Sequence, residues 1–543
     1  MISPFASKLG TNYCPSDEEV LEIQRLLVQP LSRLKGIDDK ISELQKAIDE
    51  LAEERDSVST YVEAHEALLS PLRRLPLDII QEMFIACLPT HRNCVMSAVE
   101  APVLLGRICS LWRTVSLSTP RLWARLHIAE PKQPGQTPTY EAQYAQQVAN
   151  TIAWLGRSGI CPLSISLEGS QYPPSSAAGS VSPFVEVIVS HASRWQHIAI
   201  TASSLALDTV FSLTDNDVPL LETLEIEQIH GRPSLQNVSL RLLRGPKISS
   251  LALATSDISL LALPLRWENL TSLRLANQRA GPLLPPLTSE AALQILSKCL
   301  RLRTCQLRLA DRLLAPALEE SILELPHLNS LNITCIGPTI FGPGRFFSRV
   351  LLPELRSLRI SCGSHTRHNP FFPFLTVSPR LECLQLELNL LSPLVVLDLL
   401  SMLPPTIRRL RFSLPTSRAH RIQPGVSIVR SIVRPSPFED SALEALTPSP
   451  DHPAVSCPIL QELEIDPTVD LSDQALLRFI KARMAVQSPT LQRVAIQFQR
   501  QKEFDIRPEI QLFLNSGLEV STRYFEPSVS GFSPWRGVKD PPH

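Results

Sequence analysis

The residues that could carry out chemistry are dispersed along the chain of 543 residues. Two histidines, His365 and His368, have the i, i+3 spacing that would place both imidazoles on one helix face for a metal ion, but the surrounding SCGSHTRHNPFFPF has the composition of a loop. The 11 cysteines include no CxxC pair and no cysteine–histidine spacing for a tetrahedral zinc site. We therefore interpret the histidine pair as part of a solvated loop and predict no metal site.

The short motifs of nucleotide and hydrolase chemistry are also missing from the sequence. It contains no GxSxG elbow, no GxxxxGK[ST] phosphate loop, no GxGxxG turn after a strand and no HExxH pair. Acidic residues are plentiful, but none stands out as a paired general acid and base. We therefore predict no catalytic residue and no cofactor, and we expect a protein that is not an enzyme.

Composition and charge narrow the class of protein. The length exceeds what one hydrophobic core supports, and a hydrophobic content of 44% argues against a mainly disordered chain. A net charge of -1 provides no general attraction to phosphate backbones, so nucleic acid is not an expected partner. No apolar run reaches the roughly 20 residues of a membrane span, and the N-terminus lacks the apolar stretch of a secretory signal. We expect no membrane partner and a cytoplasmic or nuclear location.

A heptad pattern is the first regular feature, inside an N-terminal segment over residues 1–69. From about residue 37 to residue 69, seam residues alternate steps of four and three, with charged residues between them, as in a solvated coiled coil. The seam consists of Ile37, Ile41, Leu44, Ile48, Leu51, Arg55, Val58 and Val62. Two interpretations stay open: a homodimer through this helix, or a helix that folds back on the segment around Val20 to Leu27 or on the following module.

A compact set of short motifs follows over residues 70–128. LRRLPLDIIQEMFIACLP is followed by a polar loop, Thr90 to Ala101, and then by APVLLGRICSLWRTVSLSTPRLWARL. We expect the first of these pieces to form a helix. Its apolar stripe is too wide for one partner helix, which indicates that an additional partner surface is needed. In their order and spacing, these pieces resemble the F-box, in the version common in fungal F-box proteins, where a heptad helix also precedes it.

The F-box resemblance implies docking on the Skp-family adaptor of a cullin-RING ubiquitin ligase. The family's adaptor-facing positions correspond to Leu75, Pro76, Ile79, Ile80, Phe84, Leu88, Pro102, Leu104, Ile108, Cys109 and Trp112. Trp123 is either another contact or a core residue. The loop from Thr90 to Ala101 is longer than a minimal F-box needs, and we expect it on the surface.

A degenerate repeat occupies most of the remaining chain. Segments of the LxxLxL type recur with a period near 26 residues, from WQHIAI at Trp195 to LQRVAI at Leu491. One step, from Ile407 to Leu460, spans 53 residues, so either a degenerate repeat or an inserted loop lies between them. Helical patterns separate the strands at Glu290 to Cys299, Ala315 to Leu325, Pro393 to Met402 and Asp473 to Met484.

The fixed period predicts an α/β fold: a leucine-rich-repeat solenoid preceded by an all-α F-box module and an N-terminal coiled-coil helix. We expect a linker over residues 129–159, the solenoid over residues 160–525, and a disordered tail over residues 526–543. The competing interpretation, a doubly wound parallel sheet, would show no fixed period and would usually bring a glycine-rich phosphate turn.

The concave strands of such a solenoid give a candidate surface for a protein substrate. Residues between the inward-facing ones form a polar and partly basic row: Arg274, Gln306, Asn332, Arg359, Gln385, Arg409 and Arg411. This row could recognise an acidic or phosphorylated segment, because arginine presents a planar fork to such groups. Glu225, Glu462 and Glu464 interrupt it, so an ordinary solvated face is the alternative.

Three functions follow from these features. The first is a substrate-recognition subunit of a Skp–cullin–F-box ubiquitin ligase, which binds the adaptor through the F-box and an unknown protein substrate through the repeats. The second is a leucine-rich-repeat interaction scaffold without ligase coupling. The third and most remote is an enzyme with an unrecognised α/β fold.

Overall fold

The chain forms two compact units in the computed structural model, Met1–Met83 and Phe84–His543. The boundary falls inside helix α2 (Leu77–Ala86), within the segment predicted as one module over residues 70–128. The structure describes residues 3–69, 74–131, 138–169, 182–229, 240–254, 260–276, 287–310, 321–335, 344–362, 372–388, 393–413, 438–448, 455–468, 471–486, 488–498 and 500–524.

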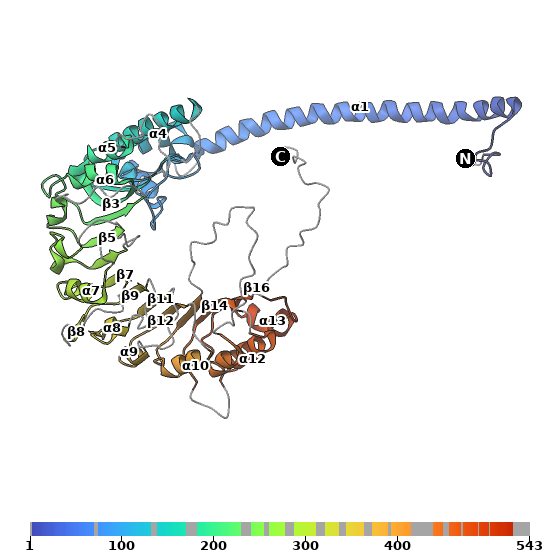
Figure 1. Cartoon of the computed structure of the whole chain (residues 1–543). Helices are drawn as coiled ribbons and strands as arrows, with labels where there is room; N and C mark the ends of the chain where they lie inside the picture. The colour runs from blue at the N-terminus through green and yellow to red at the C-terminus, as the bar shows by residue number, and fades with distance from the viewer. Residues whose placement is uncertain are drawn as a thin grey trace. The chain divides into compact units, whose positions relative to one another are not determined.

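The first unit is dominated by one continuous helix, α1 (Asp17–Leu69) (Figure 1). A capping box starts it: the Glu19 amide donates to Ser16 Oγ at 3.4 Å, and the Ser16 amide donates to Glu19 Oε2 at 2.9 Å. The predicted heptad helix is therefore confirmed but begins earlier than residue 37. Because Val20 to Leu27 lie on this same helix, the seam cannot fold back on them.

Within its described residues, the second unit contains a parallel sheet of 14 strands that are hydrogen-bonded in the order of the sequence, and a separate two-stranded sheet formed by β8 and β10. The strands of the large sheet are β1 (Arg125–Ala129), β2 (Leu163–Glu168), β3 (Trp195–Ala202), β4 (Thr223–Gln228), β5 (Ser250–Ala254), β6 (Ser272–Leu275), β7 (Thr304–Leu309), β9 (Ser330–Cys335), β11 (Ser357–Cys362), β12 (Cys383–Leu388), β13 (Arg409–Ser413), β14 (Glu462–Thr468), β15 (Arg493–Phe498) and β16 (Glu519–Arg523). Each repeat pairs only with its neighbours, as in a solenoid.

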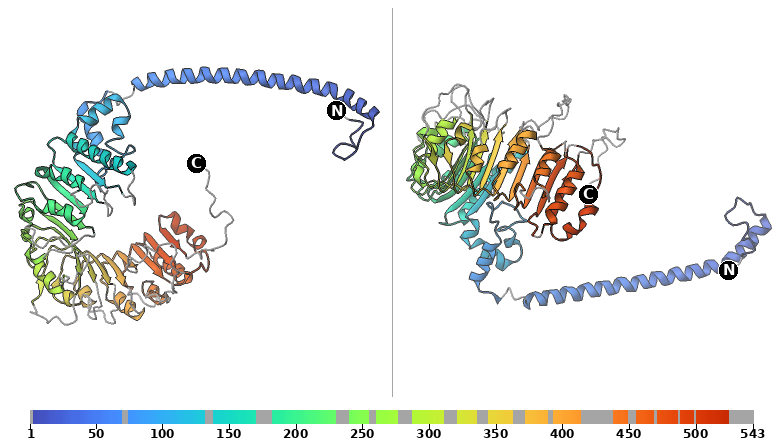
Figure 2. Two further views of the ribbon diagram at one scale, coloured as in Figure 1. Left: turned by 45° about the horizontal axis from the view of Figure 1, so that its top comes forward. Right: turned by 90° about the horizontal axis from the view of Figure 1, so that it is seen from below.

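Helices cover one face of this curved sheet, and the strands line its concave face (Figures 1 and 2). They are α4 (Pro138–Arg157), α5 (Pro183–Val189), α6 (Ser204–Phe211), α7 (Ser289–Leu296), α8 (Gly344–Phe347), α9 (Phe372–Thr376), α10 (Pro393–Met402), α11 (Asp440–Ala445), α12 (Asp473–Met484) and α13 (Arg507–Asn515). Alternate strand residues such as Leu273 and Leu275 are buried beneath these helices, so the core lies between the two layers. The predicted α/β solenoid is confirmed.

The long step between two repeats is an insertion. Strand β13 pairs directly with β14, with Leu410 opposite Leu463, so no further strand lies between them in the sheet. Short helix α11 belongs to this step. Of the predicted intervening helices, α10 and α12 match their predicted bounds. The described part of the helix expected over Ala315 to Leu325 contains instead strand β8 (Leu323–Glu324), which pairs with β10 (Val350–Leu351).

The sheet starts earlier than its predicted boundary at residue 160. Strand β1 pairs with β2, and α4 occupies most of the segment expected to be a linker over residues 129–159. Apolar side chains explain why this segment is part of the solenoid. Tyr144, Trp154 and Leu155 of α4 are buried, so this helix covers the first repeat like the helices that follow it.

The C-terminal end of the sheet is closed by α13 and β16. Gly517, at a φ of 103°, ends the helix in a conformation that favours glycine. The predicted tail, 526–543, lies outside the described residues. In the part of the chain that is described, no helix combines the length and the apolar character needed to cross a membrane.

Candidate functional site

The segment that resembles an F-box has a small aromatic core in the second unit. Phe84 lies 4.8 Å from Trp112 of α3 (Ser110–Leu117), between ring centroids. Trp123, at the end of the short helix η3 (Pro120–Trp123), is buried and donates from Nε1 to the Ser116 carbonyl at 2.8 Å. Its ring also meets that of Trp154 on α4 at 4.8 Å. Trp123 is therefore a core residue, which decides between the two roles considered for it.

The residues predicted to face an adaptor divide into two groups. Those accessible to a partner are Pro76, Ile79, Leu104, Ile108 and Cys109, which are exposed, with Leu75 and Trp112 half-buried. Those in the core are Ile80, Phe84, Leu88 and Pro102, which are buried. Adaptor contact at all of these positions stays a prediction, and the four buried side chains would have to become accessible for it.

Several exposed apolar residues were not among the predicted contacts. On α2, Leu77 and Met83 are 57% and 40% exposed, and Ile79 beside them is 45% exposed. In the second unit, Leu111 and Leu117 of α3 are exposed as well, together with Leu104 and Ile108 just before this helix. Sequence could not separate these from the buried members of the same stripes, because the two sets alternate within one helical turn.

The loop between the two predicted F-box helices is fixed to the sheet and is not a free surface loop. Cys94 is fully buried, and its carbonyl accepts from the His127 amide of β1 at 2.7 Å. Asn93 Nδ2 donates to Ser166 Oγ of β2 at 3.1 Å, and Val95 forms a parallel bridge with His127. These contacts cover the edge of β1, where unpaired backbone groups would otherwise invite another strand.

The predicted substrate row is aligned by strand register on the concave face. From β6 to β13, the residues directly opposite one another are Arg274, Gln306, Asn332, Arg359, Gln385 and Arg411, and Glu464 of β14 continues them. Arg409 is the exception, since it lies opposite Cys383 and Glu462 in the next row. Successive side chains of a strand point to opposite faces, so Arg409 and Arg411, two residues apart, lie on the same face but in neighbouring rows.

Neighbouring carboxylates neutralise part of the positive charge in this row. Arg359 forms an ion pair with Glu387, which also accepts from Gln385 Nε2 at 3.1 Å. Arg411 lies 3.3 Å from Glu464. Within the described residues, Arg274 and Arg409 have no ion-pair partner, so they carry the charge that remains available to a ligand.

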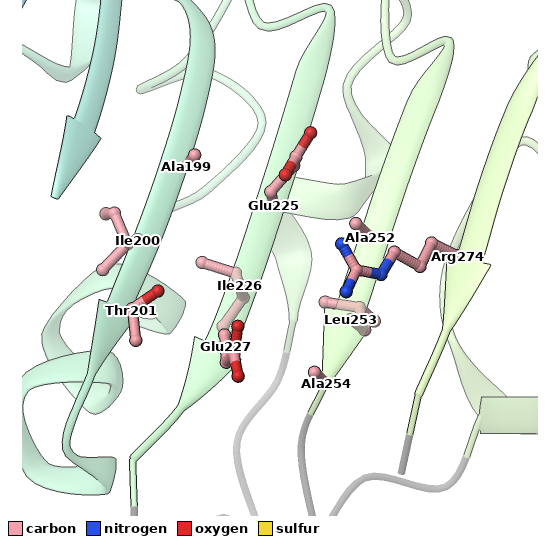
Figure 3. A pocket seen from close by; sticks show the side chains of 10 residues that line it. All are labelled: Ala199, Ile200, Thr201, Glu225, Ile226, Glu227, Ala252, Leu253, Ala254 and Arg274. Atoms are coloured by element: carbon pink, nitrogen blue, oxygen red, sulfur yellow. The ribbon is translucent and has the colours of Figure 1, made fainter. Parts of the chain in front are cut away.

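A shallow hollow of about 60 Å³ lies on the concave face beside Arg274 (Figure 3). Small neighbours produce it, because Ala199 and Ala252 flank Glu225 in the strand register. Glu227 projects from the same strand two residues further on, and the Arg274 side chain extends from β6 across β5 (Figure 3). Carboxylates and a guanidinium thus border one depression that can accept a side chain with both hydrogen-bond donors and acceptors.

Candidate metal and thiol chemistry finds little support in the described residues. Among them, no group of three or more histidines, cysteines or carboxylates is arranged to hold a metal ion. His365 and His368 lie outside the described residues. Cys305 and Cys335 are buried in strands, as expected of packing residues, and burial raises the pKa of the Cys305 thiol well above its usual range.

Neither a known family model nor a curated protein sequence matches this chain. Among solved structures, it is similar to a chain of the "Crystal structure of TLR13-ssRNA13 complex", with a TM-score of 0.33 and 13% sequence identity. The match covers 75% of this chain and 55% of that chain, so this protein spans about half the length of its structural neighbour. Its own strand order and helices define a mixed α/β protein with a parallel-sheet solenoid and a long N-terminal helix.

Proposed function

We propose that this chain is the substrate-recognition subunit of a Skp–cullin–F-box ubiquitin ligase. The F-box-like segment docks on a Skp-family adaptor, and the concave face of the sheet binds a protein substrate. The chain contributes no catalytic residue. Lysines of the bound protein are presented to the ubiquitin-charged enzyme elsewhere in the complex, so the rate enhancement comes from proximity.

The exposed apolar side chains of the F-box-like segment are the observation that carries this proposal. Ile79 and Met83 of α2, and separately Leu104, Ile108 and Leu111, are each at least 40% exposed. Clustered apolar residues on a protein surface typically mark a binding site for another protein. Their placement agrees with the family resemblance, although four of the positions carried over from the family are buried.

The connection between the predicted docking segment and the solenoid supports the same role. Helix η3 is followed by Ala124 and then directly by strand β1 of the large sheet. The contact between Trp123 and Trp154 fixes this junction further. A rigid junction of this kind would hold the part of the docking segment that lies in the second unit at a defined distance from a bound substrate, which proximity catalysis requires.

Binding of the full chain to a purified Skp-family adaptor tests the proposal. The variant Ile79→Asp with Ile108→Asp places charges at two exposed apolar positions, where each buried contact is worth about 1.5–3 kcal/mol, so we expect at least about a tenfold loss of affinity. A substitution at buried Ile80 would be less informative, because it would disturb folding.

The matched control is Ile160→Asp, which changes a residue that is 94% exposed and outside the F-box-like segment. We expect this variant to bind the adaptor like the natural sequence. Failure of the unmodified, folded chain to bind the adaptor would argue against ligase coupling, as would equal losses in the two variants.

For the substrate, the available charge favours an acidic or phosphorylated segment. Arg274 and Arg409 are the unpaired cations of the row, and Asn332 Oδ1 and Arg411 Nε are buried polar atoms without a hydrogen-bond partner. The ion pairs of Arg359 and Arg411 reduce this preference, so we expect it to depend mainly on Arg274 and Arg409.

The second candidate is an interaction scaffold without ligase coupling. The absence of any matching family model for the F-box-like segment favours it. In that case the concave face would still bind a partner protein, while the purified adaptor would not associate with the full chain. The adaptor-binding measurement therefore separates the two functions.

A further inference from the structure

An exposed heptad seam runs along α1. In heptad notation, the a positions are Leu34, Ile41, Ile48, Arg55 and Val62, and the d positions are Ile37, Leu44, Leu51 and Val58. The apolar members of this seam are 44% to 65% exposed. Four successive heptads of this kind form a stripe that a helix in water normally buries against a partner.

The partner of this seam must come from outside the first unit. One internal candidate, the segment around Val20 to Leu27, lies on the same continuous helix and cannot turn back on it. The exposed fractions of Leu44 and Leu51, 64% and 65%, show that no other described residue of the first unit covers the seam.

We propose that the seam binds α1 of a second copy of this chain, in a parallel two-stranded coiled coil with both helices in the same register. Two successive heptads have isoleucine at a and leucine at d, Ile41 with Leu44 and Ile48 with Leu51. This is the combination that favours two parallel strands. The inference does not depend on the proposed ligase function.

The charges beside the seam are complementary between two parallel copies. In such a coil a g residue lies close to the e residue of the next heptad on the other helix. Arg33 at g therefore approaches Asp38 at e of the second copy, and the reciprocal pair forms by symmetry. The other g and e positions from Lys40 to Glu66 bring no two like charges together in this register.

Arg55 is the polar a position, and it determines the register. Its guanidinium lies 2.7 Å from Asp56, so its aliphatic stem crosses the seam while its charge sits at the edge. In the parallel coil each Arg55 packs beside Glu54 at g of the second copy, which offsets the repulsion between the two arginines. Any other register would place Arg55 against an apolar layer of the second copy, which costs stability.

The oligomeric state of the full chain tests the proposal, measured by sedimentation or by light scattering at micromolar concentrations. We expect twice the mass of one chain. The variant Ile41→Lys with Ile48→Lys puts charges into the seam and should reduce the mass to that of one chain. Its matched control, Ser32→Lys with Thr60→Lys, adds the same charge at the opposite f positions and should remain dimeric.

Disulfide cross-linking tests the orientation without disrupting the helix. In a parallel coil in register, Val58→Cys faces the same residue of the second copy at a d position, so mild oxidation should give a covalent dimer. Thr60→Cys, at an outward f position, should give no more dimer than the natural sequence with its own cysteines.

Three results would overturn the inference: a monomeric unmodified chain, a dimer that survives the seam substitutions, or a dimer in which Val58→Cys does not cross-link. Adaptor binding by the seam variant should be unchanged, because its substitutions lie outside the F-box-like segment. Loss of dimerisation and loss of adaptor binding are therefore distinguishable.

Discussion

A buried carboxylate at the C-terminal end of the solenoid gives the sharpest test of how this fold is held together. The Asp473 side chain, at the start of α12, is fully buried. Its oxygens accept from Arg500 Nη2 at 2.9 Å, from the Glu503 amide at 2.9 Å and from the Tyr524 hydroxyl at 3.0 Å. One carboxylate therefore ties α12 to the two segments on either side of the last repeat.

Replacing this residue, Asp473→Asn, keeps the size of the side chain but removes its charge. Arg500 is only 16% exposed, so it would remain as a mostly buried cation whose one other counter-ion among the described residues is the half-exposed Glu503, 3.6 Å away. Breaking a buried pair costs about 3–5 kcal/mol. The remaining amide oxygen and the Glu503 carboxylate recover part of this, so we expect a loss of about 2–3 kcal/mol. Because solenoid repeats are stabilised by their neighbours, the loss should be confined to the C-terminal repeats.

The pH dependence of this stabilisation has a definite sign. Burial opposes ionisation of Asp473, but the hydrogen bonds from Arg500, the Glu503 amide and Tyr524 outweigh it and lower the pKa of the carboxyl. A lowered folded-state pKa means that the stabilisation is complete above the unfolded aspartate value of about 3.9 and is lost as the pH falls through the folded pKa. The difference between the natural chain and Asp473→Asn should therefore shrink in acid.

Denaturant unfolding combined with hydrogen exchange measures both effects. At pH near neutral, amides of β15 and β16 should lose protection in Asp473→Asn, while those of β2 to β4 should not. Asp398→Asn on α10 is the control, since Asp398 is exposed and its loss should change stability by at most about 0.5 kcal/mol. A loss below about 1 kcal/mol in Asp473→Asn, or a uniform loss of protection along the sheet, would refute this reasoning.

Three further predictions concern other buried polar groups and thiols. Arg483 is buried and donates to the carbonyls of Leu446, Cys457 and Ser456. Denaturant titrations should therefore show that Arg483→Met lowers the unfolding free energy by about 2–4 kcal/mol, and unchanged stability would contradict this role. Trp123→Phe loses its hydrogen bond at 2.8 Å and should lower the thermal midpoint through a loss of about 1 kcal/mol, which calorimetry can detect. Burial raises the pKa of the Cys299 thiol to about 12. At pH 8 a thiol reagent should therefore modify the exposed cysteines first and Cys299 only on unfolding. Rapid modification of Cys299 in the folded chain would contradict this prediction.

The repeat architecture was predictable because its signal is local and periodic. Each LxxLxL segment places alternate leucines under the helices, and the same spacing recurs many times, so even degenerate repeats predict the parallel sheet. The bounds of α10 and α12 matched for the same reason. The heptad pattern likewise predicted α1, although the capping box at Ser16 placed its start further upstream than the seam alone suggested.

The boundaries and the surfaces depended on contacts between distant residues. Helix α4 had no repeat motif to mark it. The burial of Tyr144, Trp154 and Leu155, and the contact between Trp154 and Trp123, show that the first repeat includes it. The segment from Thr90 to Ala101 looked like a polar surface loop, yet Cys94 lies in the core because its backbone bonds to β1.

By itself, the sequence determined the repeated strands and helices α1, α10 and α12, since periodicity and capping act within a few residues. Only the tertiary structure decided which side of each apolar stripe is covered: Ile79 is exposed whereas Ile80, the next residue, is buried. It also decided which arginines of the concave row have a carboxylate partner, because Glu387 and Glu464 reach Arg359 and Arg411 from neighbouring strands. Burial and ion pairing are properties of residues brought together from different repeats, and no local pattern encodes them.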